Sequence, residues 1–539
     1  MPERKLPRAS SPEEAGVSPG ELAALMGDIV ESKLELHSVM VVRHGVVAYE
    51  NFRRPYSPNF PHVMFSVSKS VTSCAVGFAV EEGLLALEDP VADLVPELRE
   101  YAPGDPNLEA LTVRHLLTMT AGKLVSPMAD KSKKRWVKDY ADGKWSYAPG
   151  EGWNYSSENT YMLCVVLKNV TGMGVTDYLM PRLFGPLGIP RPFWENDGCG
   201  VEAGGWGLYL TTESFAKIVA CYAQGGVFEG KQVIPAAWVE ASGQAQARNQ
   251  DHRTDEHGGN GYGYCFWLNK IPGSYRADGV FSQLGLIFPQ YGACVITTGG
   301  EVFTRNTLDC FLRHLPQLFE SDETLPEGEE IPDGIACAEG IPMLPGYPVL
   351  EEAPRSAAME EMLEGRTVLF PAGAQQLPKM FGFPVSVMPA AVFFMSADKA
   401  GGIDKVRFRF QANTLKFSWN EGAQRNTVLC GMDGRARLCK IALGGVEFVV
   451  NCSAAWEGDK LHVWIRPVNT VAERRLAFTF KGRQVRMLPR SAPSISVMAE
   501  YAAPFAATMI PNPALAQFVA GSLNTIVAGA EPMHFGFLR

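Results

Sequence analysis

The sequence predicts an α+β domain, an antiparallel sheet flanked by helices, followed by an all-β, barrel-like C-terminal domain. Up to about residue 320, apolar stretches of helical periodicity alternate with short strands joined by tight turns, which is typical of an α+β domain. A segment rich in proline and acidic residues follows, from Ser321 to about Glu364. Beyond it, apolar and polar residues alternate with period two, which favours an antiparallel barrel or sandwich. The length of 539 residues suffices for two or three domains.

The elements of the N-terminal part follow from local signals. A Ser-Pro turn indicates a helix within residues 10–36, and Gly45 marks the turn of a hairpin between residues 37–42 and 46–50. The polar and aromatic residues 123–150 are expected to form a loop that acts as a substrate lid. Further helices are expected at 66–82, 112–122, 158–171 and 211–223, and strands at 262–267, 276–279 and 293–297.

The C-terminal part contains the alternating segments 405–410, 415–419, 446–450, 461–466 and 476–480. Residues 501–530 carry no charge, but three prolines interrupt this run. We therefore expect it to pack on the body or on a partner subunit rather than to span a membrane. The predicted domain boundaries are 1–322 for the α+β domain, 323–370 for the linker, 371–492 for the β-domain and 493–539 for the tail.

Composition narrows the functional class. A formal net charge of −9 argues against a nucleic-acid or anionic-membrane partner. The eleven cysteines show no C-x-x-C spacing and the nine histidines no H-E-x-x-H, which disfavours a metalloenzyme. No metal or organic cofactor is expected. Unpatterned cysteines and the lack of an apolar run near Met1 predict a cytoplasmic protein with reduced thiols.

The pair Ser66 and Lys69 is the strongest candidate for catalysis. If a helix begins at Ser66, both side chains lie on one face, and a desolvated lysine can accept the serine proton. The S-x-x-K spacing also occurs at Ser214/Lys217 and at Ser396/Lys399. Only the first pair precedes a long uncharged run, residues 70–80, whereas Ser214 reads as a surface residue near a helix cap and Ser396 lies in a polar turn. On spacing alone, the alternative is that Ser66 is a small residue at an ordinary helix start.

Other nucleophile patterns are weaker. A Ser-His-Asp hydrolase of the α/β type needs a G-x-S-x-G elbow between a strand and a helix. The one match, Gly16 to Gly20, follows a polar turn instead of an apolar strand. A non-catalytic binding module remains as an alternative from another functional class.

The chain contains, in this order, the stretches Phe65–Ser70, Glu82–Val91, His115–Gly122, Tyr155–Ser157 and Gly204–Thr212. With these stretches it resembles the serine hydrolases of the class C β-lactamase and penicillin-binding-protein family, over about residues 8–320. This resemblance implies Ser66 as the nucleophile, and Lys69 and Tyr155 as the groups that manage its proton. It also implies an oxyanion hole formed by the backbone amides of Ser66 and Val280.

The third family element, a strand with a K-T-G or H-x-G box, departs from the family pattern. The chain has no Lys-[Ser/Thr]-Gly, and His257-Gly258-Gly259 lies in a glycine-rich loop, so we take residues 276–279 as the match. Family members use the box cation to hold a substrate carboxylate, and an asparagine two residues after the tyrosine. Here these positions are Ala277 and Ser157, which cannot make the same bonds. The predicted substrate-binding residues are Ser157, Ala277, Asp278 and Gly279.

The resemblance and its departures together predict a serine hydrolase that cleaves a small-molecule ester or amide through an acyl-enzyme. Alternatives are a β-lactamase, a D-Ala-D-Ala carboxypeptidase, or a catalytically weak ligand-binding module. The C-terminal region, from Cys452-Ser453-Ala454-Ala455-Trp456 onward, resembles the lipocalin-like β-domain appended to some family members. Such a domain could cover the cleft, support a homodimer or stabilise the fold.

Overall fold

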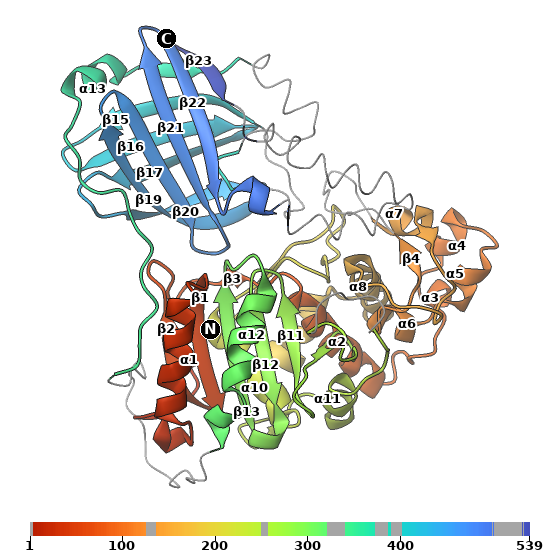
Figure 1. Ribbon diagram of the computed structural model, residues 1–539. Coiled ribbons are helices and arrows are strands. Elements are labelled where there is room, and N and C mark those ends of the chain that lie inside the picture. Colours follow the sequence, from red (N-terminus) through yellow and green to blue (C-terminus); the bar gives the residue numbers. More distant parts are fainter. Residues whose placement is uncertain are drawn as a thin grey trace. The chain divides into compact units, whose positions relative to one another are not determined.

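The computed structural model describes residues 4–124, 136–249, 257–320, 340–371, 386–389, 402–498, 500, 531 and 533–539. The chain forms two compact units, Met1–Pro345 and Gly346–Arg539 (Figure 1). The predicted order, an α+β domain followed by an all-β domain, is confirmed. The finer boundaries expected from composition stay a prediction.

Unit 1 is built on a six-stranded antiparallel sheet in the order β10-β11-β12-β13-β1-β2. The predicted hairpin is present, and its two-residue turn consists of His44 and Gly45, both at positive φ, as twisted hairpins favour. The strand bounds are β1 Leu36–Arg43, β2 Val46–Phe52, β10 Trp267–Leu268, β11 Tyr275–Gly279, β12 Gln283–Phe288 and β13 Ala293–Gly299. Of the expected strand at 262–267, only its last residue lies in β10.

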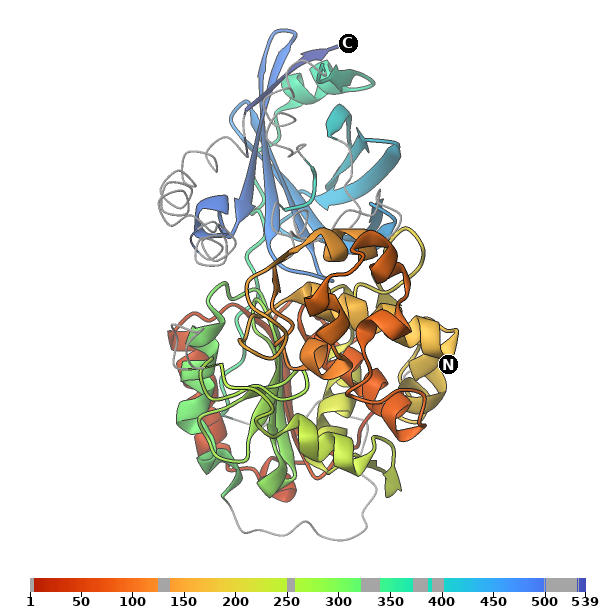
Figure 2. The same ribbon diagram turned by 90° about the vertical axis from the view of Figure 1, so that its right-hand side faces the viewer.

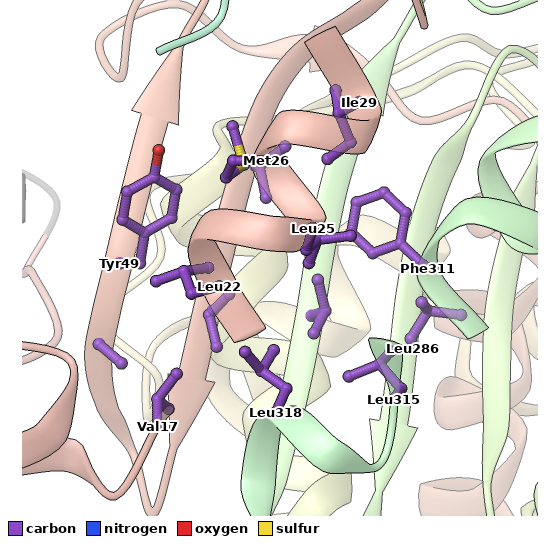
Figure 3. Packing of buried hydrophobic residues seen from close by; sticks show 14 of the residues in the cluster. Val17, Leu22, Leu25, Met26, Ile29, Tyr49, Leu286, Phe311, Leu315 and Leu318 are labelled. Carbon is purple, nitrogen blue, oxygen red and sulfur yellow. The ribbon is translucent and has the colours of Figure 1, made fainter. Parts of the chain in front are cut away.

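Helices cover both faces of this sheet, as Figure 2 shows. One face packs on α1 (Pro19–Glu31) and α12 (Thr304–His314), and α10 (Thr212–Ala223) packs on the other. Leu284, Leu286 and Phe288 of β12 belong to the core under α1 and α12, together with Leu25 and Phe311 (Figure 3). The intervening Gly285 faces α10, where a Cβ would lie 2.6 Å from Val219, so only glycine permits this close approach.

The first helix is shorter than expected. A 3-10 turn at Glu13–Ala15 precedes it, Gly16 adopts a left-handed conformation, and the Ser18 side chain caps α1 by accepting from the amide of Glu21. Residues 123–150, expected as one loop, contain β4 (Lys123–Leu124), α7 (Val137–Asp142) and β5 (Lys144–Trp145) in their described part.

The site lies among the remaining helices and short strands of unit 1. Helix α2 (Val67–Glu81) packs against α8 (Ser157–Thr171) and β11, and both helices were predicted. The other bounds are α3 Val91–Leu94, α4 Glu97–Tyr101, α5 Pro106–Ala110, α6 Val113–Leu117, α9 Val175–Leu179, α11 Ala236–Ser242, β3 His62–Val63, β6 Phe193–Trp194, β7 Leu208–Leu210, β8 Val227–Phe228 and β9 Lys231–Gln232.

Unit 2 is a barrel-like sheet of ten strands in the order β17-β16-β15-β14-β23-β22-β21-β20-β19-β18, and a β17–β19 pairing links its two ends. The period-two alternation is confirmed, since Leu415, Phe417 and Trp419 of β16 are buried while the residues between them are not. The bounds are α13 Ala357–Leu363, β14 Thr367–Leu369, β15 Ile403–Phe410, β16 Thr414–Glu421, β17 Gln424–Gly431, β18 Arg437–Leu443, β19 Val446–Glu457, β20 Lys460–Pro467, β21 Glu473–Lys481, β22 Gln484–Ala492 and β23 His534–Leu538.

Two of these strands come from segments that composition alone assigned to the linker and the tail. β14 pairs with β15 and β23, and β23 pairs with β22, so residues near the chain end contribute to the sheet. The uncharged run 501–530 lies outside the described residues. Within the described residues, no helix has the length and apolarity needed to cross a membrane.

Candidate active site

Ser66 and Lys69 meet at the start of α2, as the spacing predicted. Ser66 precedes the first residue of the helix, and the Lys69 Nζ lies 2.9 Å from the Ser66 Oγ. The residue before the serine, Phe65, has a φ of 45°, a conformation that is costly for a bulky side chain. This strained turn presents the hydroxyl at the N-terminus of a helix, where developing negative charge is favoured.

Helix α2 is buried almost all round, so its small polar residues find partners in neighbouring loops. The hydroxyl of Ser70 donates to the carbonyl of Cys265 at 2.7 Å, and that of Thr72 to the carbonyl of Gly204 at 3.0 Å. The hydroxyl of Ser68 accepts from the amide of Leu208 at 3.2 Å. The polar face of α2 thus fixes the two loops that border the Ser66–Lys69 pair.

Lys69 is a buried cation whose partners are neutral. Its side chain donates to Ser66, to the Ser157 Oγ at 2.9 Å and to the Gly205 carbonyl at 2.8 Å, which uses all three ammonium protons. No carboxylate in the described part of the chain accepts a hydrogen bond from it. Burial lowers the pKa of Lys69 to about 8, although the negative charges of Glu158 and Asp278 act in the opposite direction.

Gly205 must be a glycine for its carbonyl to reach Lys69. A Cβ there would lie 2.7 Å from both the Ser157 Cβ and the Thr160 Oγ1. Ser157 is the first residue of α8, so the close packing of this loop on α8 positions two of the three acceptors together. Ser157 was expected to contact substrate, and its contact here is with Lys69.

Tyr155 lies on the other side of the lysine. The Lys69 Nζ is 4.7 Å from the centre of the tyrosine ring, within the range of a cation–π contact. The ring packs against Trp267 at 5.2 Å, and Trp153 and Tyr262 complete an aromatic cluster. This cluster, which no local sequence pattern indicates, fixes the plane of the Tyr155 ring.

The end of β11 lies beside the serine. A Cβ on Gly279 would be 2.5 Å from the carbonyl of Met64, and the rings of Phe65 and Phe281 are 5.3 Å apart. Outside the helices and strands, the amides of Ser66 and Val280 donate to no described backbone carbonyl. Phe281 and Ser282 adopt positive φ values of 65° and 66°, which marks a second strained turn at this site.

A comparison with protein families matches the Beta-lactamase model to residues 28–300, about half of the chain, and this span contains the whole Ser66 site. The chain belongs to the Beta-lactamase family. It is therefore a member of a family of serine hydrolases, and the resemblance found in the sequence is confirmed.

Three proteins to which the chain is similar are distant from it in sequence. The 6-aminohexanoate-dimer hydrolase of Paenarthrobacter ureafaciens is 25% identical over 311 residues, which cover 53% of this chain and 79% of that protein. A lovastatin esterase of Penicillium rubens is 29% identical over 149 residues, 23% of this chain and 37% of that protein. The structure of an octameric penicillin-binding protein homologue from Pyrococcus abyssi covers 87% of this chain and 97% of that one, with 16% identity and a TM-score of 0.45.

Strand β11 contains residues 276–279, the expected match to the third family box, and the arginine on this strand is held by neighbouring groups. Arg276 is buried, and its Nε donates to Asp278 at 2.8 Å. Its other nitrogens donate to the side chain of Asn269 at 2.9 Å and to the carbonyl of His257 at 3.1 Å. Ala277 pairs with Gly285 on the opposite face, as strand alternation predicted.

The other sequence candidates lie away from the Beta-lactamase-family site. The His257 ring bonds Asp309 of α12 at 2.6 Å, so the glycine-rich loop points its histidine elsewhere. Ser214 is buried in α10 and not a surface residue, because α10 packs between the sheet and the rest of unit 1. The Ser396/Lys399 pair lies outside the described residues.

Proposed function

We propose that the protein hydrolyses an ester or amide bond through an acyl-enzyme on Ser66. The observation that carries this proposal is the contact between the Ser66 hydroxyl and a buried lysine with only neutral acceptors. A lysine with a pKa of about 8 is neutral in a substantial fraction of molecules near that pH and can then accept a proton.

In the first step, the Ser66 Oγ attacks the substrate carbonyl carbon and its proton passes to Lys69. The oxyanion lies between the amides of Ser66 and Val280, which have no backbone carbonyl to donate to in the described part of the chain outside helices and strands. Tyr155 relays the proton from Lys69 to the leaving alcohol or amine. Water then attacks the acyl-enzyme, releases the acid and returns the proton to Ser66.

We infer a substrate without an obligatory carboxylate. Arg276 is held by Asp278, Asn269 and a carbonyl, so its donors are not directed at a ligand. Ala277 offers no charge, and Asp278 adds a negative one near Lys69. The names of the two relatives, a dimer hydrolase and a lovastatin esterase, support amides and esters as the substrate class.

Ser157, Ala277, Asp278 and Gly279 remain our proposed substrate-binding residues. Ser157 bonds Lys69, and Gly279 lies close to the carbonyl of Met64, two residues before Ser66, which supports their inclusion. We also propose a cytoplasmic location, and a homodimer as one state of assembly. Turnover of β-lactams or of D-Ala-D-Ala peptides, and ligand binding without turnover, are the alternatives.

Intact mass after incubation with a fluorophosphonate tests the nucleophile. We expect one adduct on the wild-type protein and on Ser214→Ala, which removes the serine of the second S-x-x-K pair, but none on Ser66→Ala. Tyr155→Phe should retain the fold and lower the rate. Full activity in Ser66→Ala would disprove the mechanism.

A short-chain p-nitrophenyl ester and a chromogenic cephalosporin then test the substrate class. Ester turnover that depends on Ser66 supports the proposal. Fast cephalosporin turnover would show that the argument from Ala277 and Arg276 is wrong. An absence of both adduct and turnover would favour a binding module.

A further inference from the structure

The two units of the chain carry opposite charge. Residues 1–345 contain 28 Lys and Arg against 43 Asp and Glu, a net charge of −15. Residues 346–539 contain 21 against 15, a net charge of +6. The overall net charge of −9 is therefore the sum of an acidic unit 1 and a basic unit 2. The argument from net charge against an anionic partner does not apply to unit 2 by itself.

Several of these cations lie on the outer face of β15, β16 and β17. The three strands are adjacent in the sheet (Figure 1). Strand alternation sends Phe408 and Trp419 into the barrel and their neighbours outward. The register aligns the outward residues in three rows across the sheet. These rows are Lys405–Asn420–Arg425, Arg407–Ser418–Thr427 and Arg409–Lys416–Leu429.

This face is hollowed into a groove of about 350 Å³, which we call the cationic groove. Its floor is polar, and the hydroxyls of Ser418 and Thr427 bond each other at 2.9 Å at its centre. No acidic residue belongs to its lining in the described part of the chain. Its cations are Arg366, Lys405, Arg407, Arg409, Lys416 and Arg425.

The cations of the groove have few partners. Arg409 lies 3.9 Å from Glu364, a pair that is more than half exposed, and Arg407 donates to the hydroxyl of Thr367. Within the described residues, Lys405, Lys416 and Arg425 take part in no ion pair. Elsewhere on the same barrel, exposed cations such as Lys440 do have acidic partners, here Glu447 at 2.7 Å.

The sheet places two of these cations in direct opposition. Arg409 and Lys416 are cross-strand partners, and like charges at directly opposed positions destabilise a sheet. Residues two apart on one strand are separated by about 7 Å, so a second anionic group can reach Arg407 while the first lies between Arg409 and Lys416. An anion with several charged groups would bind several of these cations at once and reduce the repulsion between them.

We propose that the cationic groove binds a small molecule that carries two or more phosphate or sulfate groups. Planar guanidinium groups match the geometry of such oxyanions, and three of the groove cations in the strand rows are arginines. The serine, threonine and asparagine of the floor can donate to the oxygens that the cations leave free. This site is independent of the proposed hydrolase activity.

Calorimetric titration of the full chain with inorganic tripolyphosphate tests the proposal. We expect saturable binding with one site per chain, and a loss of affinity of about tenfold or more in Lys416→Glu/Arg425→Glu. The matched control is Lys481→Glu/Arg483→Glu, which makes the same change of charge at the exposed hairpin between β21 and β22. The control should keep its affinity within about twofold.

Two further arms identify the kind of ligand. Inorganic phosphate should bind more weakly than tripolyphosphate, because it occupies only one of the two positions. Tripolyphosphate binding that is absent from the wild type, or equal in both double variants, would overturn the proposal. So would binding to anionic vesicles or to nucleic acid without binding to tripolyphosphate, since either result would mean that the groove docks a surface or a polymer.

Discussion

Two buried cations near Ser66 differ in the partners that hold them. Lys69 donates to two hydroxyls and a backbone carbonyl, all neutral, whereas Arg276 donates to the Asp278 carboxylate as well as to an amide and a carbonyl. Lys69 is buried and bonds no carboxylate in the described part of the chain, and burial lowers its pKa to about 8. The first environment suits a group that exchanges a proton, and the second suits a group that holds structure.

The difference has a simple origin in the sequence. Lys69 lies within a helix whose neighbours offer small side chains and glycines, so only carbonyls and hydroxyls come close. Arg276 lies on a strand, and the residue two positions further on the same face is an aspartate. Lys69 and Arg276 thus have different roles because the residues that the helix and the strand place beside them differ.

Lys69→Arg should have the largest effect, because it keeps the positive charge but removes the ability to exchange a proton. Arginine cannot be deprotonated in proteins, so we expect kcat for a p-nitrophenyl ester to fall by about 10³-fold. Thermal unfolding and circular dichroism should show a folded protein. Activity near the wild-type level would show that Lys69 acts only as an electrostatic group.

Arg276→Ala should affect stability more than chemistry. It leaves a partly buried carboxylate, an amide and a carbonyl without their donor, and breaking such a buried pair costs about 3–5 kcal/mol. Urea unfolding measures this change. Arg276→Lys, which keeps the charge with fewer donors, should lose less; a loss below about 1 kcal/mol in the alanine variant would contradict the assigned role.

The sequence predicted the parts of this site that depend on short-range spacing. Ser66 and Lys69 lie one helical turn apart, and the opposition of Arg276 and Ala277 follows from strand alternation. The acceptor role of Gly205 and the aromatic cluster around Tyr155 could not be predicted in this way. Both depend on loops separated by about a hundred residues or more, and the glycines of residues 204–207 were the one local signal of close packing.

In the barrel, too, short-range patterns predicted only part of the structure. Alternation predicted β15, β16, β19, β20 and β21 but not β17, β18 or β22. β14 has three residues and β23 follows a long uncharged run, so neither has a clear local pattern. The cationic groove could not be predicted from the sequence either, because the residues of its rows are brought together by the register of β15, β16 and β17. The net charge of the whole chain does not reveal these cations, because the acidic residues of unit 1 outnumber them.

The pH dependence of acylation tests the electrostatic part of the comparison. If neutral Lys69 is the base, kcat/KM should rise with pH around an apparent pKa of about 8. The Asp278 charge raises the pKa of Lys69, so Asp278→Asn should move this rise to lower pH. Asp309→Asn, which removes a carboxylate from α12, is the control and should leave the profile in place; a shift to higher pH in Asp278→Asn would contradict the assignment.

Ser157→Ala should have the smallest effect, because it removes one of the three acceptors and leaves the lysine in place. A hydrogen bond to a charged group contributes about 1.5–3 kcal/mol, so we expect a fall in ester kcat of about tenfold or more, together with a rise in KM from the substrate-binding role that we also propose for Ser157. Ser157→Asn should restore most of this rate, since an amide oxygen can accept from the Lys69 Nζ. Steady-state kinetics of both variants separate the acceptor role from substrate binding: a rise in KM with unchanged kcat would mean that Ser157 contacts the substrate and not the lysine during catalysis.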